Sequence, residues 1–182
     1  MELDAKHFTE GTTLEADVCI VGAGPAGLVL AAELSRGNCH VILLESGSHR
    51  PEAEIRELND GDLSGDVYAG LDATRHRQVG GTSQLWNTEL AVAAGAKYAP
   101  LGATDFETRA KMEHSGWPFA FADIRSDYER AQRICGLGPF EYDGRALSRP
   151  GSEPWSELGA GVVSRVYQVG ARGDLLAPLL AT

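Results

Sequence analysis

Cysteine is scarce in this sequence, and so are uninterrupted apolar runs. The three cysteines, Cys19, Cys39 and Cys135, are too few and too scattered for a disulfide framework or a zinc site, so no metal site is expected. The longest uncharged run, Val18 to Ala32, contains glycine and proline and is too short to span a bilayer, so no membrane association is expected either. Cys19 lies inside an apolar run and is predicted to be a small buried hydrophobe.

Positive charge is also in deficit. Lysine and arginine number 16 against 26 aspartates and glutamates, which gives a formal net charge of −10. An acidic surface attracts neither nucleic acid nor an anionic membrane, so both are excluded as partners. Residues 1–16 are polar and lack the apolar core of a secretory signal, which predicts a loose arm on a cytoplasmic protein.

The most informative stretch runs from Asp17 to Glu45 and reads DVCIVGAGPAGLVLAAELSRGNCHVILLE. Val18 to Val21 is an apolar run typical of a parallel strand buried on both faces. The GxGxxG glycines then predict a tight turn that opens a helix over Ala26 to Leu34, which Gly37 is expected to end in a left-handed conformation. A second strand follows at Val41 to Leu44. The sequence therefore predicts an α/β fold with a Rossmann-like βαβ nucleotide unit.

The parts of this unit suit an adenine dinucleotide. The second glycine, Gly24, lets the backbone approach a pyrophosphate, and the amino end of the helix attracts it without any basic side chain. Pro25 fits the first helical turn, where no amide hydrogen bond is lost. Glu45, at the end of the second strand, is placed to accept hydrogen bonds from ribose hydroxyls. Because a carboxylate repels a 2′-phosphate, NADP is disfavoured.

A second stretch, Thr74 to Asn87, reads TRHRQVGGTSQLWN and has neither helical nor strand periodicity. Bare backbone at Gly80 and Gly81, followed by two hydroxyl side chains, can lie against a ligand. Taken alone, the stretch favours an ordinary turn before a buried Trp86. Its combination with the glycine motif favours the ligand-binding interpretation.

These motifs together resemble a known family. GAGPAG, Glu45, VGGTSQLWN and the later HSGWPFAFADIRSDYERA are similar to the amino-terminal part of glucose–methanol–choline (GMC) type flavin oxidoreductases, near the pyranose and glycoside oxidase branch. The similarity extends over most of residues 17–143. It implies FAD, with the Gly80 to Asn87 loop beside the pyrophosphate and the isoalloxazine ring.

The resemblance also indicates which residues bind the flavin. Some relatives attach it covalently through a histidine immediately before the tryptophan of the loop. Leu85 occupies that position here, which predicts a non-covalent flavin. Arg77 faces either phosphate or solvent. The predicted cofactor-binding residues are Val21, Gly22, Gly24, Pro25, Ala26, Gly27, Glu45, Ser46, Arg77, Gly80, Gly81, Thr82, Ser83, Leu85, Trp86 and Asn87.

The rest of the chain carries weaker signals. An acidic stretch over 46–66, with a short helix at Glu52 to Leu58, is expected to be a solvated surface. A capping box predicts a helix from Thr104 to Met112, and Asp123 is expected to cap a second helix that Gly136 ends. The core face of that helix is predicted to hold Ile124, Tyr128, Ala131 and Cys135. Residues 162–169 are predicted to form a strand.

The expected organisation is a loose arm over 1–16, the amino-terminal part of an FAD-binding domain over 17–143, and over 144–182 the truncated start of a connection to a substrate domain. In the resembling family the catalytic histidine lies in a later segment. The histidines of this chain match no such motif, so no catalytic residue is assigned.

The expected function is therefore the FAD-binding part of an oxidoreductase that acts on CH–OH groups of alcohols or sugars. Two alternatives stay open. One is a non-catalytic flavin-binding module, or one half of a split enzyme completed by another chain. The other is an NAD-dependent dehydrogenase, for which no base or substrate pocket is found in the sequence.

Overall fold

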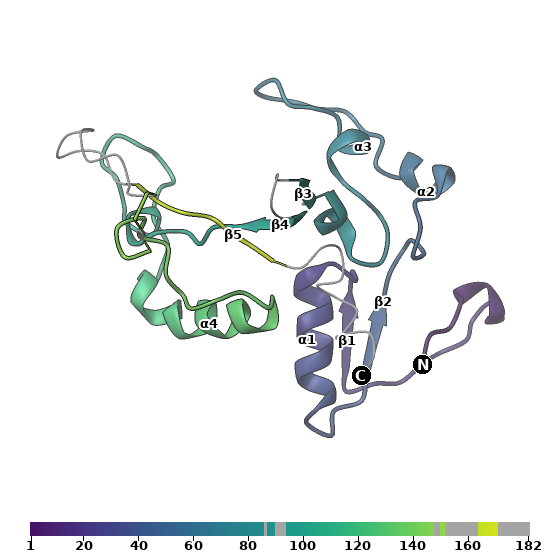
Figure 1. The fold of residues 1–182 in the computed structure, drawn as a ribbon. Coiled ribbons are helices and arrows are strands. Elements are labelled where there is room, and N and C mark those ends of the chain that lie inside the picture. The colour runs from purple at the N-terminus through teal and green to yellow at the C-terminus, as the bar shows by residue number, and fades with distance from the viewer. Residues whose placement is uncertain (86, 90–93, 148–149, 152–163, 171–182) are drawn as a thin grey trace. The chain divides into compact units, whose positions relative to one another are not determined.

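The computed structural model describes residues 1–85, 87–89, 94–147, 150–151 and 164–170 (Figure 1). The chain divides into two compact units, Met1–Thr82 and Ser83–Pro178. The described part of the second ends at residue 170. Each unit is treated by itself below, and the predicted division into arm, FAD-binding domain and connection stays a prediction.

The first unit is built on a βαβ element. Strand β1 (Val18–Val21), helix α1 (Pro25–Ser35) and strand β2 (Val41–Leu44) follow one another along the chain. The two strands are parallel, with a register that runs from Val18 opposite Val41 to Val21 opposite Leu44. Parallel neighbours require a crossover connection, which α1 supplies. The predicted α/β arrangement and both strand boundaries are therefore confirmed.

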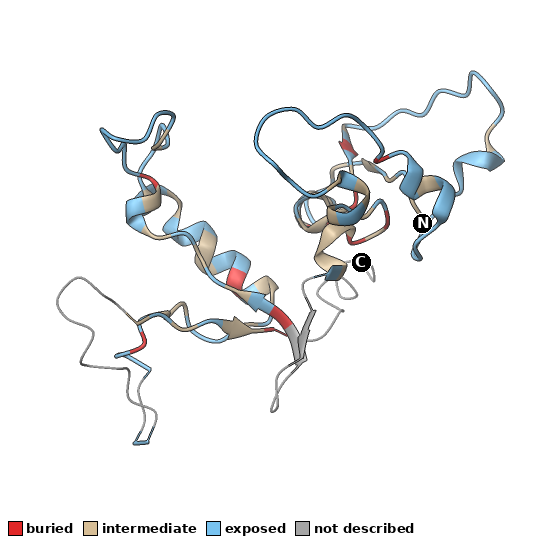
Figure 2. Ribbon diagram, turned by 90° about the horizontal axis from the view of Figure 1, so that it is seen from above, coloured by how far each residue is buried: buried red, intermediate tan, exposed pale blue. Residues whose placement is uncertain are grey.

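The burial of β1 differs from the prediction. Ile20 is buried, as are Leu28 and Ala32 of α1, so one face of the strand packs on the helix. In Figure 2 most of the described chain has the colours of exposed or intermediate residues. Cys19 and Val21 are exposed, Val21 to 83%. The expectation of a strand buried on both faces, with a buried Cys19, is wrong. Successive side chains of a strand point to opposite faces, and α1 covers one face only.

The start of α1 agrees with the sequence, and its end does not. Pro25 occupies the first turn as predicted, and Gly24 is the N-cap. Gly37 is not left-handed. Asn38 instead adopts a φ of 55°. Asparagine tolerates this region because its short polar side chain bonds locally, so it can end a helix in place of glycine.

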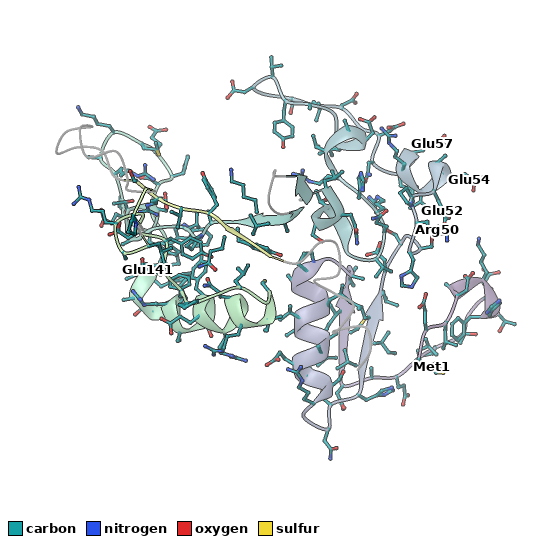
Figure 3. The ribbon with its side chains drawn as sticks, viewed as in Figure 1. Met1, Arg50, Glu52, Glu54, Glu57 and Glu141 are labelled. Atoms are coloured by element: carbon teal, nitrogen blue, oxygen red, sulfur yellow. The ribbon has the colours of Figure 1, made fainter. Side chains whose placement is uncertain are left out.

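The remainder of the first unit is short elements and loops. The arm over 1–16 contains a 3₁₀ helix, η1 (Ala5–His7). Helix α2 (Ala53–Glu57) falls where a short helix was predicted, and α3 (Leu71–Thr74) follows it. Figure 3 shows the acidic side chains Glu52, Glu54 and Glu57 around α2, and all three are exposed. This solvated surface is the one that the sequence predicts.

The second unit combines a three-stranded antiparallel sheet with one long helix. Strands β3 (Asn87–Glu89), β4 (Ala94–Tyr98) and β5 (Gln168–Val169) lie in the order β3-β4-β5. Lys97 pairs with Val169 and Tyr98 with Gln168. Within the described part of the predicted strand over 162–169, only β5 is a strand.

Helix α4 (Phe121–Ile134) confirms one helix prediction and corrects its details. Asp123 is not the N-cap but the third helical residue, where its carboxylate accepts the Ala120 N–H at 2.9 Å. Gly136, at a φ of 65°, follows the helix as predicted. Of the predicted core face, Ala131 is exposed, and the buried residue of the helix is its neighbour Gln132.

The predicted helix from Thr104 to Met112 is wrong. A single 3₁₀ turn, η3 (Ala103–Asp105), forms instead, and its capping bond runs from the Gly102 N–H to Asp105 at 2.7 Å. Phe106, the next residue, is buried. Its ring centroid lies 5.7 to 6.0 Å from the ring centroids of Trp117, Phe119 and Phe121. Tertiary burial of Phe106 ends the turn that local propensity would extend.

Desolvation dominates the electrostatics of the second unit. Burial raises the pKa of the Tyr98 hydroxyl, and the neighbouring Cys135 raises it further. Burial likewise raises the pKa of the Cys135 thiol and of the Tyr142 hydroxyl. All three groups are therefore neutral at physiological pH, and Cys135 is a thiol rather than a reactive thiolate.

Candidate functional site

The candidate site lies in the first unit, where β1 and β2 end. The Gly22 N–H donates to the Leu44 carbonyl at 2.7 Å, which extends the strand pairing by one bond. Gly22 then takes a φ of 100°, a conformation that side chains rarely adopt. The turn that follows leads directly into α1. It therefore places the first turn of α1, whose N–H groups have no acceptors within the helix, beside the carboxyl ends of the strands.

Glu45 closes this turn. Its two carboxylate oxygens accept the Ala23 N–H at 2.8 Å and the Gly47 N–H at 3.0 Å. The Ser46 hydroxyl donates to the same carboxylate at 3.3 Å. The acid predicted to bind ribose thus also fixes the backbone of the glycine-rich turn, because a carboxylate bonds backbone N–H groups more strongly than a neutral acceptor does.

The segment 76–82 brings the second motif against the first. The Gly80 N–H donates to the Ala23 carbonyl at 2.8 Å, and the Val79 N–H donates to the Ser48 carbonyl at 3.0 Å. Gly81 lies so close to Gly24 that a Cβ on Gly81 would be 3.3 Å from the Gly24 Cα. The segment therefore bonds to the residues that follow both strands. We call the arrangement of residues 22–27, 45–48 and 76–82 the glycine cradle.

The remaining predicted residues follow the cradle along the chain. Thr82 accepts the His76 N–H on its hydroxyl at 3.4 Å. The 3₁₀ helix η2 (Gly81–Leu85) begins in the first unit and ends in the second, and it contains Ser83 and Leu85. Trp86 lies outside the described residues, and Asn87 begins β3.

Arg77 is occupied by protein acceptors. Its guanidinium donates to the side-chain oxygen of Asn59 at 2.7 Å, to the Leu58 carbonyl at 3.2 Å and to the Ser46 hydroxyl at 3.5 Å. Asn59 is buried and donates in turn to the Arg75 carbonyl at 3.3 Å. Arg77 and Asn59 therefore link the acidic stretch over 46–66 to the glycine cradle. Sequence reasoning missed Asn59, because a single asparagine in a polar stretch carries no signal.

One feature of the cradle fits a dinucleotide. A Cβ on Gly24 would meet no atom within 4 Å, so open space lies beside the turn where a pyrophosphate is predicted. Space at the amino end of a helix is where backbone N–H groups can hold a phosphate.

Replacing Glu45 with glutamine tests its double role. The amide nitrogen of Glu45→Gln must face one of the two backbone N–H groups, which removes an acceptor. We expect a loss of about 1–2 kcal/mol in unfolding free energy. We also expect roughly tenfold weaker binding of ADP, whose ribose hydroxyls lose a charged acceptor.

Urea denaturation and calorimetric titration with ADP would measure the two effects. Glu10→Gln is the matched control, since Glu10 is exposed in the amino-terminal arm and should change neither quantity. Unchanged stability and affinity in Glu45→Gln would show that its carboxylate fixes neither the turn nor the ribose.

Two groups of features that would indicate other chemistry are not found in the described part of the chain. Its residues contain no cluster of three side chains able to hold a metal ion. No helix among them is long and apolar enough to cross a membrane.

Comparison with known proteins also indicates that the βαβ element is a nucleotide-binding region. Residues 20–51 match the family model of the NAD(P)-binding Rossmann-like domain. This match covers the end of β1 and the whole of α1 and β2, so the chain has an α/β nucleotide-binding fold. No solved structure gives a significant match.

Three curated proteins are similar to the chain. It is 26% identical over 179 residues to the fructose dehydrogenase large subunit of Gluconobacter japonicus, covering 79% of this chain and 31% of that protein. It is 30% identical over 141 residues to the oxygen-dependent choline dehydrogenase of Rhizobium johnstonii, covering 68% and 24% respectively. A region of 64 residues is 44% identical to the sarcosine oxidase subunit alpha of a Corynebacterium, covering 34% of this chain and 6% of that protein.

The chain therefore spans about a third or less of the length of these relatives. All three are named as oxidases or dehydrogenases. The nucleotide-binding fold and this similarity together relate the chain to oxidoreductases.

Proposed function

We propose that the chain binds FAD without a covalent bond and forms the FAD-binding part of an oxidoreductase acting on CH–OH groups of alcohols or sugars. The names of two relatives, a fructose dehydrogenase and a choline dehydrogenase, support this substrate class. When bound, FAD supplies a hydride acceptor for the carbon that carries the hydroxyl. The protein must hold and orient it.

The observation that carries the proposal is the meeting of the two glycine motifs. Gly80 and Gly81 contact Ala23 and Gly24 across more than fifty residues of sequence. In the proposed complex, the turn from Gly22 to Gly27 holds the pyrophosphate and Glu45 binds the adenosine ribose. The segment at Gly80 brings a second stretch of backbone to the same ligand. A turn that merely closed a sheet would not require this second glycine pair.

Titration with FAD followed by a visible spectrum tests the proposal. We expect the bound flavin to show a shifted and structured absorption band, and a large excess of NAD should not displace it. No flavin uptake with clear NAD binding would contradict the proposal. That result would favour the NAD-dependent dehydrogenase, for which the match of residues 20–51 to an NAD(P)-binding family model is the supporting observation.

Acid precipitation tests the non-covalent linkage. Leu85 stands where covalent flavoproteins of the resembling family have histidine, and a leucine side chain offers no nucleophile. We expect all yellow colour to remain in the supernatant after the protein is precipitated. Colour retained in the washed precipitate would show that another residue forms a covalent bond with the flavin.

A non-catalytic flavin-binding module, or one half of a split enzyme, remains the second candidate, because no catalytic base is assigned in this chain. Both candidates predict flavin uptake. Anaerobic addition of fructose, choline or simple alcohols to the loaded protein separates them. Bleaching of the flavin band would show that this chain oxidises substrate by itself, whereas an unchanged spectrum favours a module that needs a complementing chain.

A further inference from the structure

Gly47 lies where two segments of the glycine cradle, 45–48 and 76–82, meet, and it has no room for a side chain. A Cβ on Gly47 would overlap the carbonyl oxygen of Arg77, and it would lie 2.6 Å from the Arg77 carbonyl carbon and 2.9 Å from the Gln78 Cα. All three atoms belong to the backbone, so no side-chain rotation relieves the overlap. The φ of Gly47 is not in the left-handed region. Glycine is therefore required here by the close approach of segment 76–82 and not by the conformation of its own backbone.

The backbone N–H of Gly47 also fixes the Glu45 carboxylate. It donates to Oε1 at 3.0 Å, while the Ala23 N–H donates to Oε2 at 2.8 Å. The Ser46 hydroxyl donates to Oε1 at 3.3 Å. A carboxylate offers about four acceptor sites, so these donors leave acceptor capacity for a ribose hydroxyl. The two backbone donors determine which way the carboxylate faces.

Segment 76–82 is held more firmly than the turn 46–48. Arg77 donates to two acceptors outside the cradle, and the buried Gly80 donates its N–H to the turn after β1. Both serines of the turn 46–48 are exposed. A side chain added between these serines should therefore push the turn away and leave the segment in place. This movement takes away the N–H that orients Glu45.

We infer that Gly47 is a positioning residue, whose lack of a side chain lets its N–H hold the Glu45 carboxylate in the orientation that binds the adenosine ribose. Gly47 acts through Glu45 and needs no contact of its own with the ligand. The inference rests on the proposed binding of FAD by the glycine cradle, in which Glu45 accepts ribose hydroxyls. It adds a residue that neither glycine motif includes, because its role depends on a close approach between segments that are distant in sequence.

Calorimetric titration of the full chain with ADP and with 2′,3′-dideoxy-ADP measures the ribose contact. The unmodified chain should bind ADP about tenfold more tightly than the dideoxy compound, which has no ribose hydroxyls. Gly47→Ala should bind ADP about tenfold more weakly than the unmodified chain and the dideoxy compound with unchanged affinity. A purely structural role would weaken the binding of both nucleotides alike. Gly61→Ala is the matched control, since a Cβ there meets nothing within 4 Å, and it should change neither affinity.

A double variant shows whether Gly47 acts through Glu45. Glu45→Gln removes the charged acceptor and should by itself weaken ADP binding about tenfold. Because the Gly47 N–H serves to orient that carboxylate, the chain with both Glu45→Gln and Gly47→Ala should also bind ADP about tenfold more weakly than the unmodified chain. Independent effects would multiply to about a hundredfold.

Nuclear magnetic resonance of the unmodified chain tests the same contact without a substitution, and it decides the matter if Gly47→Ala does not fold. ADP should shift the resonance of the Gly47 amide more than the dideoxy compound does, because a ribose hydroxyl polarises the carboxylate that this amide bonds. The adenine and the phosphates are common to both ligands. The Gly61 amide is the control and should respond to neither.

Equal shifts of the Gly47 amide with the two nucleotides would overturn the inference. So would unchanged ADP affinity in folded Gly47→Ala, an equal loss of affinity for both nucleotides, or a hundredfold loss in the double variant. Each of these results leaves the binding of FAD by the cradle intact. If the unmodified chain bound neither ADP nor FAD, the proposed function itself would fail, and the inference with it.

Discussion

Gly24→Val is expected to weaken FAD binding at least about 100-fold, equivalent to roughly 2.7 kcal/mol. A Cβ at Gly24 meets no protein atom within 4 Å, so the valine side chain can only occupy the space beside the turn. In the proposed complex that space belongs to the pyrophosphate. The substitution therefore blocks the ligand without displacing the protein.

The stability of this variant is as informative as its affinity. Gly24 has a φ of −73°, which any residue can adopt, and it is the N-cap of α1. Valine is a poorer N-cap than glycine, which should cost no more than about 1 kcal/mol of unfolding free energy. Fluorescence titration with FAD and urea denaturation would measure the two quantities. Retained FAD affinity in a folded variant would show that the glycine motif does not hold the pyrophosphate.

Gly24→Val is expected to affect mainly ligand affinity, whereas Gly27→Ala is expected to affect mainly stability. We expect Gly27→Ala to lose about 3 kcal/mol or more in unfolding free energy. A Cβ at Gly27 would overlap the carbonyl oxygen of Gly22 and would also lie 3.4 Å from the Ile20 side chain. Both neighbours belong to β1 or to the turn after it. Since the first is backbone, no side-chain rotation relieves the overlap, and α1 must move away from the sheet.

Urea denaturation followed by far-ultraviolet circular dichroism would measure this effect. Gly61→Ala is a matched control in the same unit, because a Cβ there meets nothing within 4 Å. Unchanged stability in Gly27→Ala would mean that α1 does not pack on β1 as closely as the structure shows.

Local signals in the sequence were sufficient for the βαβ element. The apolar runs of β1 and β2, the glycines between them and Pro25 each have one main structural use, and they occur in the order that the fold requires. The burial of β1 could not be read in the same way. An apolar run shows that a strand is compatible with burial on both faces, but which faces are covered depends on elements elsewhere in the chain.

The candidate site likewise contains some residues that local sequence signals identify and others that they do not. Glu45 and the GxGxxG motif could be identified from their spacing, and Gly80 and Gly81 only from their combination with that motif. The structure brings these residues together in the first unit. Asn59 and Gln78 could not be identified, because the burial of a polar side chain depends on segments that are distant in sequence. Asn59 bonds to Arg77 eighteen residues away. No pattern of residue types distinguishes these two polar side chains from ordinary loop residues.

In the second unit, tertiary packing overrides local propensity. The capping box at Thr104 to Glu107 predicted a helix, yet η3 ends at Asp105 and Phe106 is buried among aromatic rings. Helix signals of this length are weak, since a short helix gains most of its stability from packing. The stronger periodicity of α4 was sufficient to predict that helix, although not which residue caps it.

Equilibrium dialysis of the 182-residue chain against FAD tests the central claim most directly. The glycine cradle predicts that one FAD is retained per chain and that an excess of ADP displaces it, because both ligands share the pyrophosphate and ribose contacts. Absence of FAD retention by a folded chain, or retention that ADP does not affect, would contradict the assignment of this cradle as the dinucleotide site.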